Sequence, residues 1–253
     1  MGCFPPCFDP SPPQPRSLRF ADRSYKNHAQ LTATPTAMRR LLILSLLALP
    51  ASPTVAEDDN FAPLRVGITP AMESVPVRHR GEWVWIEREQ SPDSRIDPEY
   101  AQTSRDCPPF CIQPIVLAEG VETLGELEFI DYLVRQGRDA SVKVVDARSD
   151  AEYRSGAIPG AANVPWTDLV TEVGAVDFLI EERLADFGVT LDGGKADFTG
   201  ARILVVYDNG PWCGQASGKI RALLSMGYPP QRIKWYRGGL QAWHSLGFTV
   251  ITP

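Results

Sequence analysis

The chain has 253 residues, which is enough for one or two domains. Hydrophobic residues make up 43% and charged residues 22%, and this balance excludes a fully disordered or collagen-like chain. The formal net charge of −6 at pH 7 argues against binding to nucleic acid and against adsorption to an anionic membrane. Most of the 23 prolines lie in the first 115 positions, so we expect a loop-rich N-terminal part and a compact C-terminal part.

Residues 38–56 have the pattern of a secretory signal peptide. The segment begins with Met38 and two arginines, continues with an almost unbroken apolar run at 41–49, and ends with small residues up to Ala56. The apolar run is shorter than the roughly 20 residues that span a membrane. We therefore expect an exported protein that is cleaved near Ala56, and in a bacterium this destination is the periplasm. An uncleaved anchor or a buried helix is the alternative.

Residues 1–37 precede this signal and have no apolar periodicity. They are rich in proline at the start and polar afterwards. Two interpretations are open: an over-extended gene start, with translation beginning at Met38, or a disordered cytoplasmic leader. Both place residues 1–56 outside the folded domain.

Residues 57–120 read as a small irregular N-terminal extension. Within it, residues 81–87 have strand character and residues 91–104 look like loop. The extension holds Cys107 and Cys111, which we expect to form a structural disulfide in an oxidising compartment. A redox-active pair is a second interpretation. A metal site is a third and weaker one, because two cysteines without a nearby histidine do not complete a tetrahedral shell. We expect no metal and no cofactor.

Residues 121–253 alternate between helical and strand patterns. Helices are expected around residues 124–133, 149–153, 178–187, 220–224 and 239–246, and strands at 142–146, 203–207 and 233–236. This alternation predicts an α/β fold with a mostly parallel central sheet. Active sites of such sheets form at the carboxyl ends of strands. The turns after Asp146 and after Tyr207 are therefore the candidate sites.

The second of these turns joins a buried strand to a helix. Its residues are Asp208, Asn209, Gly210, Pro211, Trp212, Cys213, Gly214, Gln215, Ala216 and Ser217. Such a loop directs backbone amides inward, and the helix dipole adds partial positive charge, so we expect an anion cradle. A cysteine in this position is expected to have a lowered pKa and to exist partly as thiolate. This makes Cys213 the candidate nucleophile.

Two further segments carry a resemblance. Asp146-Ala147-Arg148, followed by Ala151-Glu152-Tyr153 and residues 156–165, resembles the first signature of the rhodanese-like domain family. Residues 235–243, which include Arg237, and then Gly247 resemble its C-terminal signature. The resemblance covers residues 121–253 and implies a single rhodanese-like domain with helices on both faces of the sheet. It also implies sulfur transfer: a loop cysteine takes sulfur from a small donor such as thiosulfate and passes it to a thiol or to cyanide.

The loop departs from the family pattern. The family's nucleophile usually follows the strand directly, where this chain has Asp208, and Cys213 comes five residues later. A carboxylate there is expected to repel thiosulfate and to raise the pKa of a neighbouring thiol. Three hypotheses stay open: a sulfurtransferase that forms a persulfide on Cys213, an inactive binding or regulatory module, and a thiol–disulfide relay of Cys107, Cys111 and Cys213.

Other residues of the candidate site also have structural interpretations. Cys213 could be buried as a small hydrophobic residue. Asp208 could cap the following turn, and Asp146 with Arg148 could form an ion pair at a strand end. Arg237 could point toward the loop or pin the last turn. The sequence identifies no protein partner.

Overall fold

The computed structural model describes residues 65–193 and 195–253. The expected leader at 1–37, the expected signal peptide at 38–56 and the first residues of the extension lie outside the described residues. Within the described part, no helix is long and apolar enough to cross a membrane.

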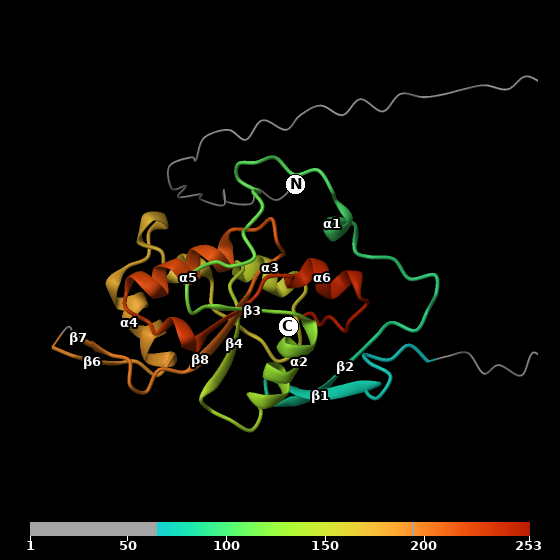
Figure 1. The fold of residues 1–253 in the computed structure, drawn as a ribbon, viewed down its shortest axis with the longest axis horizontal. Coiled ribbons are helices and arrows are strands. Elements are labelled where there is room, and N and C mark those ends of the chain that lie inside the picture. The colour runs from blue at the N-terminus through green and yellow to red at the C-terminus, as the bar shows by residue number, and fades with distance from the viewer. Residues whose placement is uncertain (1–64, 194) are drawn as a thin grey trace, which may run out of the picture. The chain divides into compact units, whose positions relative to one another are not determined.

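A five-stranded sheet forms the centre of the domain (Figure 1). Its strand order is β3 (Glu122–Leu124), β9 (Ile233–Tyr236), β8 (Ile203–Tyr207), β4 (Val142–Asp146) and β5 (Ala162–Asn163). Every neighbouring pair is parallel. The sequence of β8, Ile-Leu-Val-Val-Tyr, is apolar at each position because both faces of a parallel sheet are covered. The expected α/β fold with a parallel sheet is confirmed.

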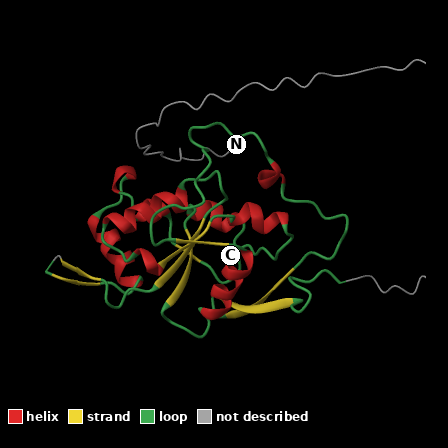
Figure 2. Ribbon diagram, in the orientation of Figure 1, coloured by secondary structure: helices red, strands yellow, loops and turns green. Residues whose placement is uncertain are grey.

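Helices cover both faces of this sheet (Figure 2). The core on one face includes residues of α4 (Asp177–Asp186) and α5 (Gln215–Ser225). The core on the other face includes residues of α2 (Glu126–Arg135) and α6 (Gly239–Ser245). Neighbouring residues of β8 alternate between the two cores, as the strand period of two requires.

Shorter elements complete the main domain. Helix α3 (Asp150–Ser155) follows β4, and a hairpin of β6 (Thr190–Asp192) and β7 (Lys195–Asp197) follows α4. Three 3-10 turns are η1 (Trp166–Asp168), η2 (Thr171–Val173) and η3 (Pro230–Arg232). Leu124, expected at the start of a helix, instead ends β3, because α2 begins only at Glu126.

The N-terminal extension contains a hairpin of β1 (Ser74–His79) and β2 (Glu82–Glu87), which agrees with the strand expected at 81–87. The expectation of loop for residues 91–104 is wrong at α1 (Pro98–Ala101). The Asp97 side chain caps this short helix by accepting from the Glu99 amide at 2.9 Å. Tyr100 is buried, so tertiary packing holds the helix in place.

Candidate functional site

The carboxyl ends of three strands meet at one edge of the sheet. Asp146, Tyr207 and Tyr236 end β4, β8 and β9, and the register pairs Asp146 with Tyr207 and Tyr207 with Tyr236. The segments that follow these strands therefore begin side by side. The loop of residues 208–214, between β8 and α5, is the central one. Both turns selected from the sequence thus lie at this edge.

The side chain of Asp208 fills the predicted amide cradle. Its carboxylate accepts hydrogen bonds from the backbone amides of Gly210, at 3.1 Å, and Ala216, at 2.8 Å, and the residue is 1% exposed. Gly214, at the N-cap of α5, has no side chain to do this. In the first turn of α5, the Ser217 hydroxyl donates to the Gly214 carbonyl at 3.2 Å. Asp208 therefore caps the helix in the place where the cradle would take an external anion.

Cys213 is buried in a small cluster of its own. It is 1% exposed and packs with Trp212, and Phe110 of the extension packs against both. This cluster is separate from the two cores that flank the sheet. The Cys213 sulfur lies 4.0 Å from Nδ2 of Asn209, and its backbone amide donates to the Gly210 carbonyl at 2.9 Å. The thiol thus belongs to the loop rather than to the domain core.

A buried carboxylate holds the loop from the side. Nδ2 of Asn209 donates to Oε1 of Glu152 at 2.6 Å, and Nε2 of Gln215 donates to Oε2 at 3.0 Å. Burial alone would raise the pKa of Glu152, but hydrogen bonds from Ser149, Asn209 and Gln215 outweigh it and keep the pKa below its usual value. Sequence reasoning missed this role of Glu152. The available signal was its spacing from Ser149, since the two residues form a capping box at α3.

The predicted ion pair at the end of β4 exists and contacts the same loop. Nη2 of Arg148 lies 2.7 Å from Oδ2 of Asp146, and both side chains are essentially buried. Nη1 of Arg148 and the hydroxyl of Tyr100 both donate to Oδ1 of Asn209, at 3.4 and 3.2 Å. Burial would lower the pKa of Arg148, but the charge and hydrogen bonds of Asp146 raise it overall. The guanidinium is therefore always charged, and it orients Asn209 beside Cys213.

A close backbone contact fixes the loop from the side of α6. Gly239 has φ +56°, and a Cβ atom there would lie 2.3 Å from the carbonyl oxygen of Asp208. That carbonyl accepts from the Leu240 amide at 3.0 Å. Nε1 of Trp212 donates to Oε1 of Gln241 at 2.7 Å. Only glycine permits this approach, so the loop and the start of α6 form one unit.

Residues 105–114 of the extension, named the cover segment below, pack on the loop. Within it Cys107 and Cys111 are paired, with Cα atoms 4.7 Å apart. Phe110 lies between them in sequence and meets the Trp212 ring edge-on, with centroids 5.6 Å apart. The predicted disulfide between Cys107 and Cys111 therefore flanks Phe110, the residue that contacts the loop.

Polar contacts at both ends of the cover segment anchor it. The guanidinium of Arg105 stacks over the same tryptophan ring at 3.6 Å. The Gln113 amide donates to the carbonyl of Pro211 at 2.8 Å. Arg237 donates to the carbonyls of Gln113 and Pro114, at 2.7 and 3.2 Å. Arg237 therefore holds the cover segment, a role that neither sequence interpretation of this residue contained.

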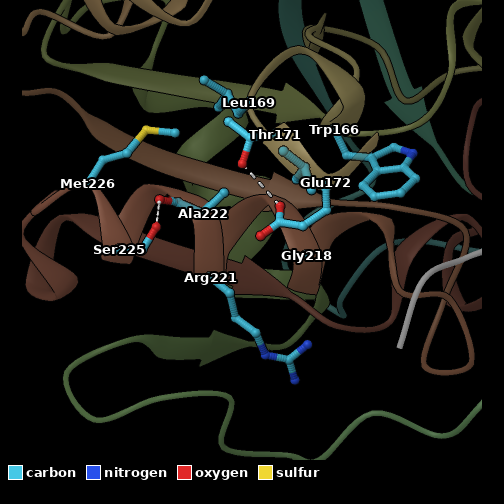
Figure 3. A pocket seen from close by; sticks show the side chains of 10 residues that line it. Trp166, Leu169, Thr171, Glu172, Gly218, Arg221, Ala222, Ser225 and Met226 are labelled. Atoms are coloured by element: carbon cyan, nitrogen blue, oxygen red, sulfur yellow. Dashed lines mark hydrogen bonds between the residues drawn. The ribbon is translucent and has the colours of Figure 1, made fainter. Parts of the chain in front are cut away.

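A separate pocket of about 250 Å³ lies between η1, η2 and α5 (Figure 3). Trp166, Leu169 and Met226 form apolar parts of its wall, and the Arg221 guanidinium is directed away from Trp166. None of the site residues predicted from the sequence lines this pocket. Among residues 65–193 and 195–253, no group of three or more His, Cys, Asp or Glu side chains is placed to hold a metal ion.

Comparisons with known proteins agree with the resemblance seen in the sequence. Residues 130–246 match the family model of the rhodanese-like domain. An HTH-type transcriptional regulator of Mycobacterium tuberculosis is 29% identical over 118 residues, which cover 47% of this chain and 41% of the regulator. The chain therefore spans less than half of that relative.

Two solved structures are also similar. The rhodanese-like domain of a protein from Anabaena sp. is 20% identical with a TM-score of 0.34, covering 54% of this chain and 81% of that one. A protein of unknown function from Rhodopseudomonas palustris, described as a possible tyrosine phosphatase, is 22% identical with a TM-score of 0.36. That match covers 53% of this chain and 90% of the other.

Proposed function

Since residues 130–246 form a rhodanese-like domain, we propose that this domain moves sulfane sulfur through a persulfide on Cys213. The observation that carries the proposal is the position of this thiol. It lies on the loop between β8 and α5, beside the amide of Asn209, and belongs to neither core of the sheet. Trp212 of the loop and Phe110 of the cover segment pack around it. A nucleophile in this position becomes accessible without disruption of the domain core.

The proposed reaction has two steps. The Cys213 thiolate attacks the outer sulfur of thiosulfate, the sulfur–sulfur bond breaks, and sulfite leaves with the bonding pair. Cyanide or an acceptor thiolate then attacks the terminal sulfur of the persulfide, which restores the Cys213 thiolate. Asn209 is placed to donate to the sulfur in both states, since Arg148 and Glu152 fix its amide.

The intact mass of the purified protein after exposure to thiosulfate tests this proposal. The protein is first treated with a dithiol reductant, which is then removed. We expect a gain of one sulfur atom that cyanide removes and that Cys213→Ser lacks. An unchanged mass of the wild-type protein would exclude Cys213 as the sulfur carrier. So would a gain of one sulfur atom in Cys213→Ser equal to that of the wild type.

A second function is favoured by a different observation, the carboxylate of Asp208 in the amide cradle. This charge opposes the approach of a thiosulfate dianion, as expected for a binding or regulatory module that has lost transfer. The double variant Asp208→Cys, Cys213→Ser places a thiol where the family usually has its nucleophile. An adduct on this variant combined with none on the wild type would exclude transfer through Cys213 and support a module that lost transfer at position 208.

We also propose that the protein is exported. The support is the signal-peptide pattern of residues 38–56 and the pairing of Cys107 with Cys111, which is typical of an oxidising compartment. In a bacterial host, we expect the mature protein in the periplasmic fraction, with an N-terminus at or near Glu57. A full-length chain that stays in the cytoplasm with two reduced thiols would contradict export.

A further inference from the structure

The contact between the cover segment and the loop depends on a five-residue turn, Cys107–Cys111, whose two ends are joined by a disulfide. Cys107 and Cys111 close this turn. Phe110, which lies within the turn, packs against the cluster of Trp212 and Cys213. Within this turn the backbone donates two hydrogen bonds, from Phe110 to Asp106 at 2.9 Å and from Cys111 to Pro109 at 3.1 Å. The Cys111 carbonyl accepts a third from Nε2 of Gln113 at 3.2 Å. No helix or strand continues through the turn. The Arg105 guanidinium also lies 5.8 Å from the centre of the Phe110 ring. The disulfide is the covalent link that holds the two ends of the turn together around Phe110.

The two ends of the cover segment are held independently of the disulfide. Arg105 stacks on Trp212, and Arg237 binds the carbonyls of Gln113 and Pro114. Loss of the disulfide would leave these anchors in place and free the turn between them. The segment would open locally, as short segments with few backbone hydrogen bonds do.

We propose that the Cys107–Cys111 disulfide is a redox latch that controls access to Cys213. A dithiol reductant, in a protein or a small molecule, transfers two electrons and two protons to the disulfide, which becomes two thiols, and the reductant becomes a disulfide. Phe110 then leaves Trp212, and Cys213 becomes accessible. The latch determines only whether Cys213 is accessible to reagents. Its biological purpose rests on the proposed sulfur transfer, but its existence does not.

The rate at which iodoacetamide alkylates Cys213 tests the latch directly. Trypsin separates the thiols, because cleavage after Arg105 and Arg202 places Cys213 and the Cys107–Cys111 pair in different peptides. We expect alkylation of Cys213 to accelerate roughly tenfold or more after reduction of the disulfide. The double variant Cys107→Ser, Cys111→Ser should react at the fast rate without any reductant.

Two phenylalanine variants separate the latch from a general loss of structure. Phe110→Ala keeps the disulfide but removes the ring that covers the loop, so its oxidised form should already react fast. Phe178→Ala, at a position that is 76% exposed on α4, is the matched control and should behave like the wild type.

Urea denaturation of each form shows whether the fold is retained. Equal alkylation rates in the oxidised and reduced wild type, with the fold intact, would overturn the latch. So would a reduced form that reacts fast only because the whole domain has unfolded. Alkylation requires no sulfur donor, so a latch without sulfur transfer and sulfur transfer without a latch are distinguishable results.

Discussion

The carboxylate of Asp208 accepts a hydrogen bond from the backbone amide of Ala216 at 2.8 Å, across eight positions of the chain. The same carboxylate binds the Gly210 amide at 3.1 Å. Together these bonds close the loop on itself and cap α5 from outside the helix. The residue that stands where the family usually has its nucleophile is thus part of the loop's scaffold.

Replacement of Asp208 tests this capping role. Asp208→Ala leaves the amides of Gly210 and Ala216 without their acceptor, and we expect the free energy of unfolding to fall by about 1–3 kcal/mol. Asp208→Asn keeps one acceptor oxygen and should lose less. Urea denaturation measures both variants, with the exposed Asp93→Ala as the control. An Asp208→Ala variant as stable as the wild type would show that the cap contributes nothing.

The approach of Gly239 to the loop predicts a steric effect. In Gly239→Ala the new Cβ would lie 2.3 Å from the Asp208 carbonyl oxygen, so the loop or the start of α6 must move. Gly193 has nearly the same φ, +54° against +56°, but nothing lies within 4 Å of its Cβ position. Gly193→Ala should therefore show only the backbone cost, about 1–2 kcal/mol. We expect a clearly larger loss for Gly239→Ala in urea denaturation, and equal losses would contradict the contact.

The buried ion pair predicts a strong effect from removal of one partner. Arg148→Met leaves the Asp146 carboxylate buried without its counter-charge, and we expect a loss of about 3–5 kcal/mol. Arg154, which pairs with Asp150 on the exposed side of α3, is the control, and Arg154→Met should change stability by less than about 0.5 kcal/mol. Thermal or urea unfolding gives both values. Similar small losses in the two variants would mean that Asp146 finds other partners.

The burial of Lys219 predicts that the free energy of unfolding depends on pH. Its ammonium is fully buried and donates to the carbonyls of Val164 and Pro165, at 2.5 and 3.4 Å. Burial lowers its pKa from 10.5 to about 7. Between these two values the unfolded chain holds a proton that the folded chain has lost. The unfolded state therefore binds more protons in this window, and the free energy of unfolding rises with pH from about 7 to about 10.

The matching variants isolate this titration. Lys219→Met should flatten the rise between pH 7 and pH 10, while Lys195→Met, at an exposed position of β7, should leave it unchanged. Urea denaturation at several pH values across the window measures the slope. Parallel profiles for the wild type and Lys219→Met would show that Lys219 keeps its proton on folding.

Local sequence patterns predicted three of the five strands of the central sheet and the edge at which the candidate turns lie. The strand patterns expected at 142–146, 203–207 and 233–236 coincide with β4, β8 and β9. Parallel strands end at one edge, so the amino-acid sequence alone places the turns after Asp146 and Tyr207 together. The pairing of Arg148 with Asp146 followed because the two residues are only two positions apart.

Tertiary structure decided what the loop residues do. The contacts of Glu152 with Asn209, of Phe110 with Trp212 and of Arg237 with Gln113 each join residues more than 50 positions apart. Periodicity shows which face of an element is buried but not which distant side chain meets it. The cradle of amides could be expected from the strand–loop–helix pattern. That Asp208 could cap the following turn was one of the sequence interpretations, since the amides that donate to its carboxylate lie only two and eight positions away. That Phe110 of the cover segment packs on Trp212 and Cys213 depends on the N-terminal extension, which no local pattern encodes.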